Sequence, residues 1–155
     1  MSVGAELSAG DYQVKSVTET DLGAITVENA DTYSNLALWL ESEHRFYDRY
    51  LNIKPGLRVE HYSLSGENVV DPRLVVTHEL ESKATIRESI GLFHQPPSVA
   101  DSLWGNEDLL SSYSIQATMG VDVPLSDTLN IAATGFYSEL RNLPVDDPNA
   151  SMESL

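Results

Sequence analysis

Residues 94–109, HQPPSVADSLWGNEDL, hold a dense group of side chains that could do chemistry. His94, Ser98 and Asp101 are the residue types of a nucleophilic hydrolase, in which a histidine activates a serine and an acid orients the histidine. Such enzymes also need a sharp turn that exposes the serine, typically G-x-S-x-G, and this motif does not surround Ser98. We therefore predict a loop without a catalytic site, in a chain that is not an enzyme.

Metal binding is also disfavoured by the spacing of the candidate ligands. The histidines show neither H-x-H nor H-x₃-H spacing and fall at positions 44, 61, 78 and 94. The acidic pairs Glu107-Asp108 and Asp146-Asp147 lack the alternating carboxylates of a calcium loop. We predict neither a metal nor a cofactor, and interpret these acids as solvated loop residues.

Composition narrows the class of protein and its partners. The chain has 155 residues, the length of one domain, and its 24 Asp and Glu against 9 Lys and Arg give a formal net charge of −15. Such acidity repels a phosphate backbone, so nucleic acid is not an expected partner. Cysteine is absent, which excludes disulfides. The start, MSVGAELSAG, lacks the basic and apolar regions of a secretory signal peptide.

Alternation of apolar and polar residues predicts that most of the chain is β-strand. In residues 113–123 one face is wholly apolar and the other is wholly polar or small. No segment of helical length has an apolar stripe with a 3.6-residue period. We predict seven strands, at residues 2–16, 36–45, 51–61, 73–80, 85–93, 113–123 and 128–140.

The connectors between these strands alternate in length. Short ones fall at 47–49, 81–83 and 125–127, and long ones at 18–31, 64–71, 95–112 and 142–155. The long connectors hold 12 of the 24 acids and none of the Lys or Arg. In an antiparallel meander this order places every short turn at one end and every long, acidic loop at the other.

These patterns predict an all-β fold, an antiparallel up-and-down meander of about seven or eight strands that forms a barrel or a segment of barrel wall. Residues 1–155 form a single domain in this interpretation. A soluble β-sandwich would show the same alternation, although Greek-key sandwiches have substantial loops at both ends.

The predicted strands also place two groups of side chains. Aromatic residues near the long connectors predict an interfacial girdle and are Tyr33, Tyr62, Phe93, Tyr113 and Tyr137. Charged residues of the polar face predict cross-strand ion pairs and are Arg58, Glu60, Arg73, Glu79 and Arg87.

Short motifs in residues 50–145 resemble the barrel of TonB-dependent outer-membrane receptors. They occur in the family's order and are G-L-R-V-E at 56–60, D-P-R at 71–73, P-P-S at 96–98, G-N-E-D-L at 105–109 and G-V-D at 120–122. The resemblance implies a barrel in outer-membrane lipid that takes up iron chelates, vitamins or oligosaccharides. It also implies a small-molecule ligand at the outer loops, where the candidate contacts are Asp101, Trp104, Glu107 and Asp108.

Some features depart from this family. Its barrels have about 22 strands and a plug, and the plug carries the contact segment for an energy-transducing partner. Neither plug nor contact segment is recognisable here, so we do not expect that partner to bind. Glu88 falls on the apolar face between Ile86 and Ile90, where lipid disfavours charge. The acidity, Glu88 and the lack of a signal peptide favour the alternative, a soluble all-β binding or interaction module without a transport role.

Overall fold

The structure, a computed structural model, describes residues 1–20, 23–46, 50–98 and 109–144. The strands in these ranges are β1 (Ser2–Thr20), β2 (Gly23–Glu41), β3 (His44–Phe46), β4 (Leu51–Tyr62), β5 (Asn68–Glu79), β6 (Thr85–Gln95), β7 (Ser112–Ser126) and β8 (Leu129–Arg141). Within the described ranges, no helix is long and apolar enough to span a membrane.

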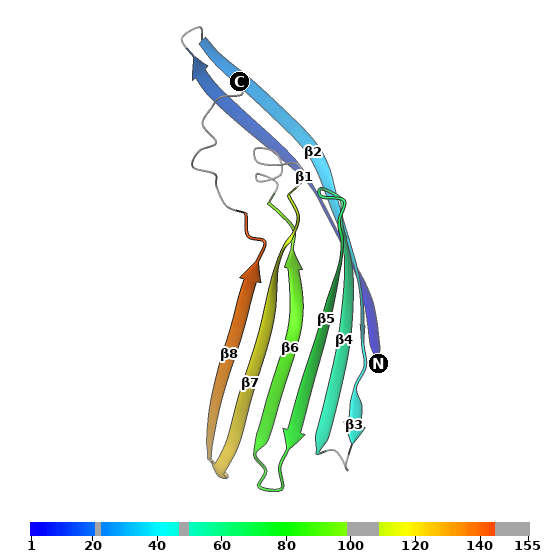
Figure 1. Ribbon diagram of the computed structural model, residues 1–155, viewed down its shortest axis with the longest axis vertical. Helices are drawn as coiled ribbons and strands as arrows, with labels where there is room; N and C mark the ends of the chain where they lie inside the picture. Colours follow the sequence, from blue (N-terminus) through cyan, green and yellow to red (C-terminus); the bar gives the residue numbers. More distant parts are fainter. Residues whose placement is uncertain (21–22, 47–49, 99–108, 145–155) are drawn as a thin grey trace.

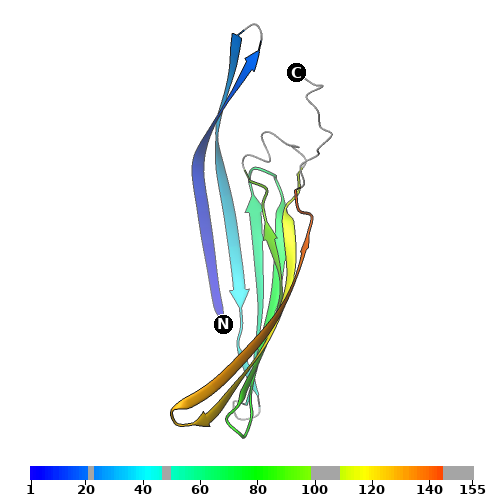
Figure 2. The ribbon, with the colours of Figure 1, turned by 90° about the vertical axis from the view of Figure 1, so that its left-hand side faces the viewer.

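The strands form one antiparallel sheet in the order β1-β2-β4-β5-β6-β7-β8, which is not closed (Figure 1). The short strand β3 follows β2 along the chain and also pairs with β4. The predicted meander is therefore confirmed, with the predicted strand at 36–45 divided between β2 and β3. Figure 2 shows the twist of this sheet from the side, with β7 and β8 crossing its lower end.

The two ends of the sheet differ only in part as predicted. The β6–β7 connector at 96–111 is long, whereas the β4–β5 connector at 63–67 is no longer than the β5–β6 turn at 80–84. The connectors β4–β5 and β6–β7 lie at one end, which we call the long-loop end, and the turns β5–β6 and β7–β8 lie at the other, the short-turn end (Figure 1). The β5–β6 turn is closed by a hydrogen bond of 2.8 Å from the N–H of Leu80 to the carbonyl of Ala84. Lys83 has a φ of 66° in this turn.

The prediction of a long loop at 18–31 was wrong. The register of β1 and β2 continues to Thr20 opposite Gly23, whereas β2 pairs with β4 only over residues 35–41. Residues 10–20 and 23–34 thus form a two-stranded ribbon that projects beyond the other strands (Figure 1). Lys15 and Glu28 form an ion pair of 2.7 Å across it, and its Val, Thr and Ile residues favour extended backbone. The connector predicted at 64–71 is also shorter, because β5 begins at Asn68.

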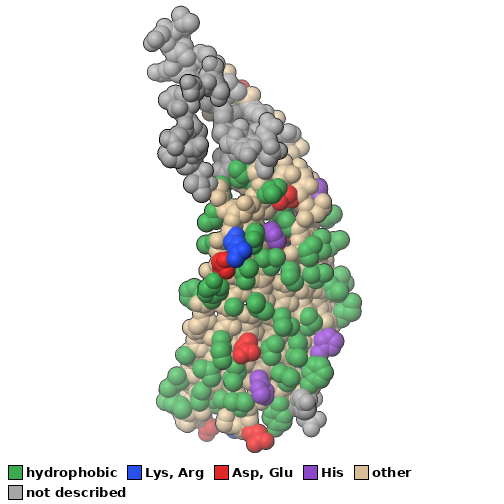
Figure 3. All heavy atoms as spheres, in the orientation of Figure 1, with side chains coloured by type: hydrophobic (Ala, Val, Ile, Leu, Met, Phe, Trp, Pro, Cys, Tyr) green, Lys and Arg blue, Asp and Glu red, His purple; other side chains and the backbone are tan. Residues whose placement is uncertain are grey.

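Alternate residues divide the sheet into an apolar face and a polar face. Figure 3 shows hydrophobic side chains spread over the face turned toward the viewer. Few hydrophobic residues are buried among those described, namely Ala37, Tyr62, Val69 and Ala84. Large residues of the apolar face remain open, with Ile90 53% and Met119 58% exposed. A single sheet has no second layer to cover this face, and a soluble monomer rarely leaves so large an apolar surface bare.

Candidate functional site

The polar face is braced by arginines that reach across strands. Arg58 on β4 donates from Nε to Glu60 at 2.5 Å and from Nη2 to Glu6 on β1 at 3.2 Å. Its guanidinium carbon lies 5.6 Å from the ring centre of Trp39, and Glu60 also accepts a hydrogen bond from the hydroxyl of Tyr62. Arg58 therefore joins two carboxylates and an aromatic ring on three strands.

Arg73 makes a second brace of the same kind. It donates from β5 to Glu41 on β2 at 3.0 Å and passes β4 at Gly56, where an added Cβ would lie 2.7 Å from the Arg73 Nε. Arg87 donates to Asp122 on the neighbouring strand at 2.9 Å. The predicted bracing ion pairs are confirmed for Arg58, Arg73 and Arg87. Glu79 makes no side-chain hydrogen bond or ion pair with the residues that the structure describes.

Glycines on the polar face are covered by large side chains of the paired strand. Gly4 pairs with Trp39 and Gly10 pairs with Tyr33, and an added Cβ would overlap the Trp39 ring or lie 2.9 Å from Tyr33 Cε1. Gly135, on the apolar face, has no atom within 4 Å of such a Cβ. The polar face is therefore crowded and the apolar face is open.

We expect Gly4→Val to displace the Trp39 ring from Arg58 and to cost about 1–3 kcal/mol of unfolding free energy, because overpacking forces side chains from their preferred positions. Gly135→Val is the matched control and should change stability little. Denaturant unfolding followed by tryptophan fluorescence measures both. Equal stability of the two variants would contradict this packing.

A hollow of about 230 Å³ lies on the polar face near the long-loop end. Its walls include Glu6, Asn35, Arg58, Tyr62 and Gln95. The charge of Arg58 is balanced by its two carboxylates, so the hollow offers mainly hydrogen-bonding groups to a small molecule.

His94 braces the sheet where β5 and β6 separate. Their register ends at Arg73 opposite Gly91, and beyond this point Asp71 accepts from the N–H of His94 at 3.3 Å and contacts its Nδ1 at 2.5 Å. The His94 ring lies 5.5 Å from that of Tyr113. The structure thus gives His94 a structural partner, Asp71, that the sequence did not indicate.

Two side chains hold the base of the β6–β7 connector. Glu67 accepts from the N–H of Ser111 at 2.8 Å and from its hydroxyl at 2.5 Å. Asn142 donates to the carbonyls of Leu110 at 3.3 Å and Ser111 at 2.8 Å. These contacts between distant segments were missed because no local pattern indicates them. The predicted ligand residues all lie outside the described residues and are Asp101, Trp104, Glu107 and Asp108.

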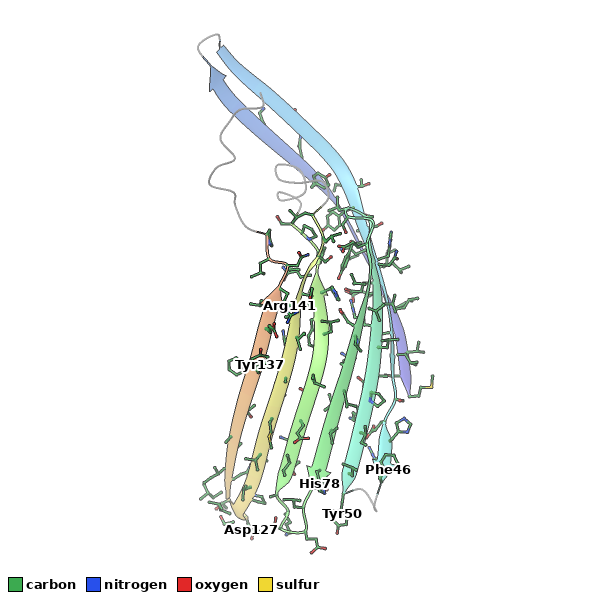
Figure 4. The ribbon with its side chains drawn as sticks, in the orientation of Figure 1. Phe46, Tyr50, His78, Asp127, Tyr137 and Arg141 are labelled. Carbon is green, nitrogen blue, oxygen red and sulfur yellow. The ribbon has the colours of Figure 1, made fainter. Side chains whose placement is uncertain are left out.

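The predicted aromatic girdle was only partly right. Tyr137 pairs with Ala117 on the apolar face, and Tyr113 lies on the same face, paired with His94 and Arg141 (Tyr137 and Arg141 are labelled in Figure 4). The others alternate onto the polar face, where Tyr62 is 3% exposed, and these are Tyr33, Tyr62 and Phe93. Among the described residues, no cluster of His, Asp and Glu could hold a metal ion.

The apolar band of the apolar face runs obliquely across the strands. Toward the long-loop end it stops on β2 at Leu36, before Ser34, and on β8 at Tyr137, before Glu139. When the paired residues are followed across the sheet, Tyr137 lies in the same row as Leu74 of β5, and Leu36 lies in the same row as Asn68 of β5. On β5, Asn68 is three two-residue steps nearer the long-loop end than Leu74.

This offset gives the angle between the band and the strands. Three two-residue steps are about 20 Å along a strand, and the five spacings from β2 to β8 are about 24 Å across the sheet. If the edge of the apolar band lies parallel to the membrane surface, the strands are therefore tilted by about 40° from the membrane normal. This tilt is within the range of transmembrane barrels. An oblique apolar band, a braced polar face and a long β6–β7 connector at one end define the wall of a transmembrane β-barrel.

The comparison with known families agrees with this class. The chain belongs to the TonB dependent receptor-like β-barrel family, whose model matches residues 3–154. It is therefore part of a receptor barrel of a family of outer-membrane transport proteins that are typically not enzymes.

A solved structure shows the same fold. The copper transporter OprC superposes with a TM-score of 0.69 at 12% sequence identity, over 89% of this chain and 27% of OprC. The chain thus spans about a quarter of the length of that protein. No curated protein sequence matches the chain.

Proposed function

We propose that this chain forms part of the wall of an uptake receptor, with its apolar face against outer-membrane lipid, its polar face toward the lumen and its long-loop end toward a small-molecule ligand. The oblique apolar band carries this proposal. The strands of a membrane barrel are tilted, so an apolar band that lies level with the membrane crosses them obliquely. The strand lengths agree with it: β4 to β8 have 11 to 15 residues, and a membrane crossing needs about 9–11.

The ligand is proposed to belong to the iron chelates, vitamins or oligosaccharides that the family takes up. Its first contacts would come from the β6–β7 connector, where the candidate residues are Asp101, Trp104, Glu107 and Asp108. The contacts of Glu67 and Asn142 with Ser111 support this assignment, because they fix one base of that connector. The hollow beside Arg58 would take polar groups of the same ligand.

The requirement for lipid or detergent tests the proposal. Circular dichroism of the purified chain should show folded β-structure in detergent micelles and not in plain buffer. A monodisperse chain with a cooperative melt in plain buffer would instead support the soluble binding module.

Glu88 offers a further test. It pairs with Val76 and Met119 on the apolar face, and its side chain makes no hydrogen bond or ion pair with the residues described. We expect Glu88→Ala to stabilise the inserted chain by about 1–2 kcal/mol, because a carboxylate in lipid costs energy. Glu79→Ala, which removes an equally unpaired acid from the polar face, should change little. Urea titration in lipid vesicles measures both, and a loss of stability in Glu88→Ala would contradict lipid contact.

A further inference from the structure

Glu88 is a charged residue deep inside the apolar band. On β6 the apolar face runs from His94 through Leu92 and Ile90 to Glu88, and the apolar band begins at Leu92. Glu88 is four residues nearer the short-turn end than Leu92, about 13 Å along the strand and, at a tilt of about 40°, about 10 Å in depth. The apolar band of a barrel is about 25 Å tall. The carboxylate of Glu88 therefore lies near the middle of the lipid.

The chain gives this carboxylate no partner. The side chain of Glu88 is exposed and makes no hydrogen bond or ion pair with the residues described. Arg87, its neighbour on β6, lies on the polar face and pairs with Asp122. Among the direct and diagonal neighbours of Glu88 on the apolar face, only His78 of β5 is titratable (Figure 4), and the two do not hydrogen-bond. Ionisable side chains inside a membrane are rare and commonly mark functional sites.

A groove of about 440 Å³ lies beside Glu88 on the same face. The residues of the apolar face that line it are Met119, Val121, Ala133 and Gly135. Glu88 pairs with Met119, which pairs with Gly135, so the carboxylate and the groove share one row of the sheet. No atom lies within 4 Å of a Cβ added at Gly135. The groove therefore has room for a side chain from another molecule.

The depth and the charge of Glu88 limit what can bind here. A lipid chain can fill the groove, but the charged headgroup of a lipid stays at the membrane surface and does not reach Glu88. A second copy of the chain would meet the first at equal depth, and its described residues place no Lys or Arg on the apolar face inside the band.

Small residues and polar side chains are the features by which transmembrane segments pack together. Resting on the membrane function proposed above, we propose that Glu88 and this groove bind a transmembrane segment of another membrane protein. The segment places a basic side chain against Glu88 and an apolar side chain over Gly135.

Binding of two transmembrane peptides tests this inference. Both are apolar helices of about 20 residues, one with arginine and one with leucine at its centre, and both carry an acceptor dye. The full chain in lipid vesicles carries the donor dye on Asp127→Cys, its only cysteine. Energy transfer should show that the arginine peptide binds about tenfold more tightly than the leucine peptide, because hydrogen bonds to charged groups contribute at least this much.

Three variants show whether the named residues are responsible. Glu88→Gln should remove the preference for the arginine peptide, whereas Glu79→Gln, which changes an unpaired acid of the polar face, should keep it. Gly135→Leu fills the groove and should weaken the binding of both peptides. Unchanged preference in Glu88→Gln would overturn the inference.

The other occupants of the site give different results, and each would also overturn the inference. Equal binding of the two peptides would assign the groove to lipid. Association of the chain without peptide, abolished by Glu88→Gln, would assign the site to a second copy. A preference for arginine that appears only in His78→Leu would show that His78 satisfies Glu88. The membrane proposal fails separately, if β-structure forms without detergent.

Discussion

Ile90→Arg is expected to destabilise the inserted chain by about 2–4 kcal/mol, the cost of an arginine near the middle of the lipid face of a barrel. Ile90 lies on β6 between Leu74 and Ala117 of the neighbouring strands, inside the apolar band. The guanidinium would have to leave its hydration shell or thin the lipid around it.

Val17→Arg is the matched control. Val17 is 55% exposed and Ile90 is 53% exposed, so a protein in water would accept an arginine at either position. Val17 lies on the ribbon, beyond the apolar band, where we expect the free energy of unfolding to change by at most about 0.5 kcal/mol. Urea titration in lipid vesicles gives both values. Equal effects at the two positions would show that Ile90 does not face lipid.

Arg58→Ala is expected to cost about 2–4 kcal/mol, because it leaves Glu60 and Glu6 without their cation. The side chain of Glu60 is only 13% exposed, so its charge cannot be fully hydrated in the variant. Trp39 loses the guanidinium that lies over its ring. The loss should therefore exceed that of an ordinary surface ion pair.

Arg45→Ala provides that comparison. Arg45 pairs with Glu43 at 2.7 Å, but its side chain is 60% exposed, and such pairs contribute at most about 1 kcal/mol. In thermal unfolding in detergent micelles, the melting temperature of Arg58→Ala should be well below that of Arg45→Ala. If both variants melt with the parent chain, Arg58 does not brace the wall.

The strands and the two faces could be predicted because they depend on local alternation. The ribbon could not be predicted, because the positions that continue the apolar face carry polar and charged residues there. Asp11, Lys15 and Glu28 occupy the alternate positions that hold Val3, Leu7 and Leu36 nearer the short-turn end. A search for apolar positions therefore ends where the strands leave the apolar band, although the strand pairing goes on.

The braces could be predicted only in part. Alternation placed Arg58 and Arg73 on the polar face, but their partners Glu6 and Glu41 lie two strands away. Such contacts depend on the register and on the small residues Ala37 and Gly56 of the strand between. The same holds for Asp71 with His94, which meet only because β5 and β6 separate.

The depth of single labels in a lipid bilayer tests the central claim most directly. His44 and Gly135 lie in one row of the register, through Ile53, Val76, Glu88 and Met119. Nitroxide labels on His44→Cys and Gly135→Cys should nevertheless differ in depth, with 135 in the hydrocarbon and 44 near the short-turn surface. Labels on Leu36→Cys and Tyr137→Cys should lie at one depth, near the long-loop surface. Equal depth at 44 and 135, or access of water to all four labels, would contradict a tilted wall in lipid.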